Sequence, residues 1–413
     1  MNLFKISEFR VGGLLFSSQI CAFLGLLVLA KVGLGVSDFY SVVQQIGTAA
    51  HNGFVLSVVY GLIIGRPGFS RWGLLYFVAC CISPLFGIVF YMQGEHVAEG
   101  MLHGSSVQNA ILVLYSLGGA VLAFNGINSV RLACLGRAEF MAGVLFVPNA
   151  LMAVASIVFF FSGDQRLLVV MPALAWVVGN LAVVVKIRKA LSAALVVEND
   201  RVEGTVSHKE DGRQTVLHGV GLAVGSIVGT VFPIYFLSAV KEVVSGGATA
   251  LYFSNRIGGV LISNVVNSKL FVGYSWEKSS IGVNPIVVIS CFISCVASLV
   301  SVVLFDLKIN GAGPFIYAVA WLFSLIGTPF LIAECNSRRK NIFIFIKSCL
   351  DLVFAFVSLW ILRSHPSLVG YFCVFVISQA VTGVVCGIAL GLFSIAGFSL
   401  LLLISSFWIL FFN

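Results

Sequence analysis

The sequence predicts an all-α polytopic membrane protein in which two six-helix lobes surround a central cavity. Hydrophobic residues make up 59% of the 413 residues and charged residues only 10%, against about 25% charged residues in soluble domains. Apolar stretches of bilayer-spanning length recur along the whole chain. Successive loops also alternate between many and few Lys and Arg residues, as in multi-pass membrane proteins. A soluble fold has too little interior to bury so much apolar surface.

The first six spans are predicted to form an N-terminal lobe over residues 1–186. Each stretch holds about 20 mostly apolar residues, which is the length that crosses a bilayer as a helix. The expected spans are 11–34, 39–65, 71–93, 106–130, 140–163 and 167–185.

A charged segment, 187–214, follows as a linker between the lobes, and the next six spans are predicted to form a C-terminal lobe over 215–391. An extra helix is expected at 392–413, separated from the preceding span by a charge-free joint, so that the total is 12 or 13 spans. The C-terminal spans are expected at 215–239, 247–272, 284–305, 314–335, 341–362, 367–391 and 393–412.

The distribution of basic residues predicts the orientation. Of the 24 Lys and Arg residues, 17 lie in the N-terminal segment and even-numbered loops, 4 in odd-numbered loops and 3 within spans. The positive-inside rule therefore places the N-terminus and the linker in the cytoplasm. The same rule explains the net charge of +8, so that no nucleic-acid partner is implied.

Signatures of catalysis and metal binding are missing from the sequence. It has no phosphate-binding Gly-rich loop with Lys-Ser/Thr, no HExxH and no GxSxG pattern. The 10 cysteines lie within or beside apolar segments and form no CxxC pair, which favours packing over metal binding. We therefore expect no catalytic residue, no metal and no cofactor.

The two halves share a faint internal repeat. Gln45-Ile46-Gly47 of span two and Arg256-Ile257-Gly258 of span eight lie 211 residues apart, and each follows a turn rich in small residues. The repeat and the six-plus-six layout favour a duplicated transporter with a cavity between its lobes.

Span eight carries a polar stripe around a basic residue. An ionisable residue within a span costs roughly 2.5–3.5 kcal/mol, so its presence calls for a function. Tyr252, Arg256 and Asn267 fall on one helical face, with Asn255 beside them. The planar guanidinium of Arg256 suits a phosphate group because it binds bidentately and stays charged. A structural ion pair between the lobes is the alternative.

Span two carries a matching stripe of Tyr40, Gln44 and His51, which we predict to face the cavity. Packing within the lobe is the alternative for His51. Lys31 ends span one, where it either reaches the cavity or extends to the outer membrane surface. Asp38 opens span two, where capping of the helix N-terminus would explain it.

Lys347 and Asp351 lie four residues apart in span eleven and so share a helical face. A mutually neutralising structural pair is one interpretation. A proton or cation coupling site at Asp351 is the other.

Two segments resemble the lipid II flippases of the MviN/MurJ type. Residues 246–275 resemble their span eight through Tyr252-Phe253, Asn255 and Arg256-Ile257. Residues 33–54 resemble their first outer turn and span two through Asp38-Phe39. The wider set is the multidrug/oligosaccharidyl-lipid/polysaccharide (MOP) exporter superfamily, which includes Wzx-type flippases of polysaccharide repeat units.

The resemblance implies a flippase in the bacterial cytoplasmic (inner) membrane. Its substrate would be an undecaprenyl-pyrophosphate-linked oligosaccharide, carried to the outer leaflet by alternating access. The resemblance also implies membrane lipids and glycan polymerase or assembly proteins as partners. Where the lipid II flippases carry an Arg pair deep in span two, this chain has His51-Asn52, which favours O-antigen or exopolysaccharide units over the peptidoglycan precursor.

Two other function classes stay open. An ion-coupled drug or metabolite exporter of the same superfamily would usually need a carboxylate in span one or seven, and 11–34 and 215–239 contain none. A membrane glycan polymerase or ligase would be expected to carry a larger outer loop with catalytic residues.

Overall fold

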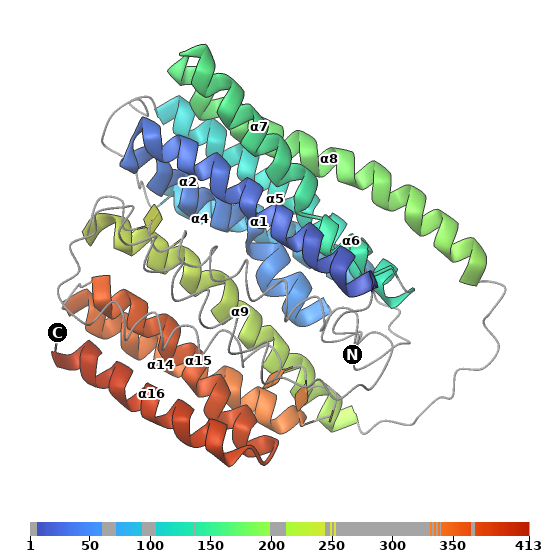
Figure 1. Cartoon of the computed structure of the whole chain (residues 1–413). Coiled ribbons are helices and arrows are strands. Elements are labelled where there is room, and N and C mark those ends of the chain that lie inside the picture. Colours follow the sequence, from blue (N-terminus) through green and yellow to red (C-terminus); the bar gives the residue numbers. More distant parts are fainter. Residues whose placement is uncertain are drawn as a thin grey trace.

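The computed structural model describes residues 6–59, 72–92, 105–135, 137–198, 212–243, 248–249, 252, 331–332, 334–335, 338, 340–364 and 368–412. Every regular element in these ranges is a helix, and the helices lie side by side as long rods (Figure 1). Seven of them are long and apolar enough to cross a membrane. The prediction of an all-α polytopic membrane protein is thus confirmed.

The helices follow the predicted spans to within a few residues over most of the described chain. The segment predicted as the N-terminal lobe contains α1 (Ile6–Val32), α2 (Leu34–Ala49), the π-helix η1 (Ala50–Val59), α4 (Trp72–Met92), α5 (Ser105–Cys134), α6 (Glu139–Gly143), α7 (Phe146–Ser162) and most of α8 (Gln165–Glu198). The segment predicted as the C-terminal lobe contains α9 (Gly212–Val243), α14 (Asn341–Ser364) and α15 (Leu368–Ala389), and the predicted extra helix corresponds to α16 (Phe393–Phe412). The predicted span at 284–305 lies wholly outside the described residues, as do most of the predicted spans at 247–272 and 314–335.

Helix α8 is longer than its predicted span. Its 34 residues correspond to about 51 Å at 1.5 Å per residue, well beyond the roughly 30 Å apolar layer of a bilayer. Its last turns run past the neighbouring helices (Figure 1). Residues 187–198 were predicted as linker, but they contain neither Gly nor Pro and consist largely of good helix formers.

Small residues allow the helices of the N-terminal lobe to approach closely. Ser83 of α4 lies against Gly119 of α5, where an added Cβ would come within 2.6 Å of the Ser83 hydroxyl oxygen. The same Cβ would lie 2.5 Å from the carbonyl oxygen of Gly47 in α2. Small residues at such crossings permit backbone contact, which stabilises helix pairs in membranes.

An aromatic stack fixes α2 within this lobe. The stack consists of Tyr40 of α2, Tyr115 of α5 and Trp176 of α8, which are all fully buried. The ring centroids of Tyr40 and Tyr115 are 5.9 Å apart, and those of Tyr115 and Trp176 are 4.8 Å apart. The other side of α2 faces the C-terminal lobe, where it packs on α9.

Span two changes its helical form midway. The α-helical hydrogen-bond pattern of α2 gives way to the wider π-helical pattern of η1 at Ala50. π-helical segments are rare and are often found at functional sites. Phe54 of η1 packs on a C-terminal-lobe cluster that includes Leu222, Ile344 and Cys386. Span two therefore contacts both lobes along its length.

Candidate functional site

The two lobes are joined by a buried polar contact between α2 and residue 249. The backbone N–H of Thr249 donates to Asp38 Oδ1 at 2.7 Å, and its hydroxyl donates to the same oxygen at 2.5 Å. The hydroxyl also lies 2.8 Å from that of Ser37. Asp38 is only 4% exposed, so its carboxylate depends on these donors for stabilisation. We call Ser37, Asp38 and Thr249 the inter-lobe contact.

A second hydrogen bond joins the lobes further along span two. The Tyr252 hydroxyl donates to Gln44 Oε1 at 2.8 Å, and both residues are buried. The amide nitrogen of Gln44 lies 3.6 Å from the sulfur of Met152 in α7. Gln44 therefore links the C-terminal lobe to the core of the N-terminal lobe.

The contact pairs corresponding positions of the two halves. Asp38 and Thr249 are separated by 211 residues, which is also the spacing of the Gln-Ile-Gly and Arg-Ile-Gly segments. Corresponding residues meet where a two-fold axis passes between two related units. If the faint repeat reflects two related halves, the inter-lobe contact is the place where a pseudo-two-fold axis between them is expected.

Two of the predictions for span two need correction. Asp38 does not cap its own helix, because α2 begins after Gly33 and the Asp38 carboxylate binds the other lobe instead. Tyr40 does not face a cavity: its hydroxyl donates to the carbonyl oxygen of Val169 in α8, and its ring belongs to the buried aromatic stack. Tyr40 is therefore a core residue of the N-terminal lobe.

His51 packs within the N-terminal half, and Lys31 is exposed at the end of α1. His51 is 3% exposed and packs on α5, where an added Cβ at Gly126 would lie 2.6 Å from its Nδ1. That Nδ1 has no hydrogen-bond partner among the described residues. Lys31 is exposed in the last turn of α1, where its long side chain is able to extend toward the membrane surface.

Of the predicted stripe on span eight, the structure describes Tyr252. Arg256, Asn255 and Asn267 lie outside the described residues. Their assignment to a substrate site stays a prediction from the sequence.

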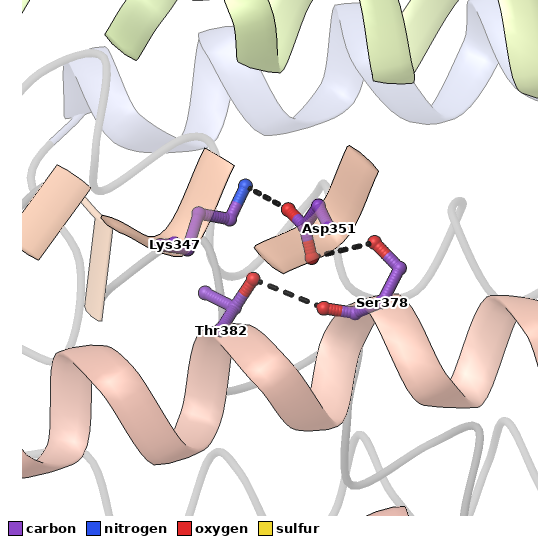
Figure 2. A network of polar contacts seen from close by, with 4 residues as sticks. All are labelled: Lys347, Asp351, Ser378 and Thr382. Atoms are coloured by element: carbon purple, nitrogen blue, oxygen red, sulfur yellow. Dashed lines mark hydrogen bonds and ion pairs between the residues drawn. The ribbon is translucent and has the colours of Figure 1, made fainter. Parts of the chain in front are cut away.

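Lys347 and Asp351 form an ion pair inside the C-terminal lobe (Figure 2). The Nζ–Oδ2 distance is 2.7 Å, and Asp351 is 2% exposed. The hydroxyl of Ser378 in α15 donates to the other carboxylate oxygen at 3.4 Å. Thr382 continues the network by donating to the carbonyl oxygen of Ser378 at 3.2 Å. The pair therefore ties α14 to α15, and its opposite charges neutralise each other.

Sequence reasoning missed Ser37 and Thr249 as lobe-joining residues. Both are small polar residues in segments that already carried the resemblance, and neither is ionisable. The internal repeat could have identified Thr249, because the residue 211 positions after Asp38 is Thr249.

Neither a family model nor a curated protein matches this sequence, but solved structures share its fold. A MATE transporter in complex with MaL6 aligns with a TM-score of 0.50 at 16% identity, covering 95% of this chain and 96% of that one. A MATE complex with MaD5 gives 0.49 at 16% identity over 95% and 96%. A MOP superfamily transporter from Pyrococcus furiosus gives 0.46 at 14% identity over 98% and 95%. The first alignment shows that the fold is that of a MATE transporter.

Proposed function

We infer from this fold that the chain is an exporter of the MOP superfamily, which moves its substrate by alternating access between the two lobes. The observation that carries this inference is the inter-lobe contact, which consists of a few buried hydrogen bonds between α2 and Thr249. Such a contact breaks without unfolding either lobe, since water is able to replace each lost hydrogen bond. Rocking of the lobes would then open the space between spans two and eight.

We further propose that the substrate is an undecaprenyl-pyrophosphate-linked oligosaccharide, moved from the cytoplasmic to the outer leaflet. In the sequence, Arg256 follows Tyr252 by four residues, one helical turn. Tyr252 contacts Gln44 at 2.8 Å, so the predicted stripe of span eight begins at the junction of the lobes. A guanidinium one turn further on suits the doubly anionic pyrophosphate linker.

An ion-coupled small-molecule exporter of the same superfamily is the second candidate. The MATE-like fold favours it as much as it favours a flippase. Such an exporter needs a carboxylate that releases and rebinds a cation. Among the described residues, the buried carboxylates are those of Asp38 and Asp351, and each is engaged by partners within the protein.

Reconstitution into proteoliposomes tests the proposal. Wild-type protein should transfer a fluorescent lipid-linked pyrophosphate oligosaccharide across the bilayer. Arg256→Ala removes a charge-assisted contact of roughly 1.5–3 kcal/mol, which should weaken headgroup binding by about 10- to 150-fold. Arg256→Lys should recover only part of it, because Lys lacks the bidentate fork.

Arg363→Ala is the matched control, since Arg363 is exposed at the end of α14. Equal transfer by wild type and Arg256→Ala would refute the role of Arg256. Gradient-driven export of a cationic dye, with no transfer of the lipid-linked sugar, would favour the second candidate.

A further inference from the structure

A cavity lies at the end of the N-terminal lobe, between α1, α6, α7 and α8. Its volume is ≈ 90 Å³. Most of its walls are apolar, with Leu14, Phe146 and Val147 among the lining residues. The two charged side chains in the lining are those of Glu139 and Lys186. Apolar walls with charges among them suit an amphiphilic ligand that has a polar head and a hydrocarbon chain.

The charges around this cavity are mainly positive. Glu139 is held by Arg137 at 3.5 Å, so its charge is largely compensated. Lys186 is exposed and forms no ion pair within the described part of the chain. Lys189 lies one turn further along the same face of α8 and is also exposed. The net positive charge favours an anionic headgroup.

The two lysines also lie at the level of lipid headgroups. The apolar part of α8 ends at Val185, and its basic residues begin at Lys186. Basic residues at the end of a span meet the phosphate layer of the membrane. Val183 and Val147, which also line the cavity, belong to the apolar parts of α8 and α7. A lipid phosphate and an acyl chain would thus be within reach of the same site.

We propose that this cavity binds an anionic phospholipid with a hydroxyl-bearing headgroup, of the phosphatidylglycerol type. The phosphate contacts Lys186 and Lys189, and a headgroup hydroxyl donates to the carboxylate of Glu139. The first part of one acyl chain fills the apolar cavity beside Leu14. This lipid is a bound component of the N-terminal lobe and is separate from the transported substrate.

Native mass spectrometry of the purified protein tests the site, using phosphatidylglycerol, phosphatidylethanolamine and phosphatidylcholine with the same acyl chains. Wild-type protein should bind phosphatidylglycerol most tightly. Lys186→Gln with Lys189→Gln should weaken that binding about 25-fold, since each basic residue near a lipid surface contributes about five-fold. The matched control is Arg166→Gln with Arg363→Gln, which removes the same charge from exposed positions elsewhere and should change binding little.

Gly143→Leu tests the cavity separately from the charges. Gly143 lines the cavity, and an added Cβ there meets only Leu14 Cδ1 at 3.8 Å, so the lobe should tolerate the change. The larger side chain should reduce phosphatidylglycerol binding with both lysines intact. Unchanged binding in this variant, or equal losses in the lysine and control variants, would overturn the proposal. Tighter binding of phosphatidylethanolamine that depends on Glu139 would also overturn it, in favour of a zwitterionic lipid.

Discussion

Removing the carboxylate of Asp38 should release the inter-lobe contact. Asp38 Oδ1 accepts two hydrogen bonds from Thr249, at 2.7 and 2.5 Å. Hydrogen bonds to a charged group contribute roughly 1.5–3 kcal/mol each, so Asp38→Ala should destabilise the closed contact by about 3–6 kcal/mol. The lower value alone changes an equilibrium about 160-fold. A contact closed 99% of the time would then be open in most molecules.

Distances between spin labels at Leu34 and Ser364 would report this change. Both residues are exposed, one at the start of α2 and the other at the end of α14. In a background without native cysteines, Asp38→Ala should add a longer distance to the distribution. Asp38→Asn should have a smaller effect, because its amide oxygen still accepts a hydrogen bond. Ser405→Ala, which removes an exposed hydroxyl from α16, is the control.

A double-mutant cycle with Thr249→Ala provides the stricter test. If the two residues act through each other, the effects of the single changes should not add, and the coupling should exceed 0.5 kcal/mol, the usual threshold for residues in contact. An unchanged distance distribution in Asp38→Ala would refute the idea that this contact holds the lobes together.

Three further predictions concern stability and orientation. Asp351→Asn should lower the free energy of unfolding by about 3–5 kcal/mol, because it removes a buried charge from the ion pair and leaves the partly buried Lys347 without its partner; replacing the pair by Lys347→Met with Asp351→Leu should restore much of the thermal stability in detergent. Full stability of Asp351→Asn with loss of transport would instead indicate ion coupling. Gly119→Ala should lower the unfolding temperature, since overpacking costs about 1–3 kcal/mol, whereas Gly73→Ala meets nothing within 4 Å and should be neutral. A cysteine replacing Thr205 should react with a membrane-impermeant maleimide only after cells are permeabilised; labelling of intact cells would reverse the predicted orientation.

Hydropathy predicted most of the described helices because every segment that crosses a bilayer as a helix needs about 20 mostly apolar residues. The prediction failed for helical residues outside the apolar layer, where this requirement does not apply. Residues 187–198 of α8 continue as helix outside the apolar layer, and hydropathy does not report a helix made of charged and small residues. The change to a π-helix at Ala50 likewise has no signature in the apolar pattern.

Span two shows why helical periodicity alone does not define a site. Helical periodicity placed Tyr40 and Gln44 on one stripe, and Gln44 does contact the other lobe. Periodicity shows that two residues share a face but does not identify the neighbour of that face. Span two has protein neighbours on several sides. The Tyr40 hydroxyl donates to a carbonyl oxygen of α8, whereas the Asp38 carboxylate accepts from Thr249.

The pairing of Asp38 with Thr249 bears on how such a protein arises by gene duplication. In an assembly of two identical lobes, the positions beside the symmetry axis must hold the same residue. Two aspartates there would repel each other, and two threonines would form only a neutral hydrogen bond of about 1 kcal/mol. Once the copies are fused in one chain, each position mutates independently, and an acid is able to face its donor. Fusion therefore permits a charge-assisted contact at this point, which neither of these two symmetric pairs would provide.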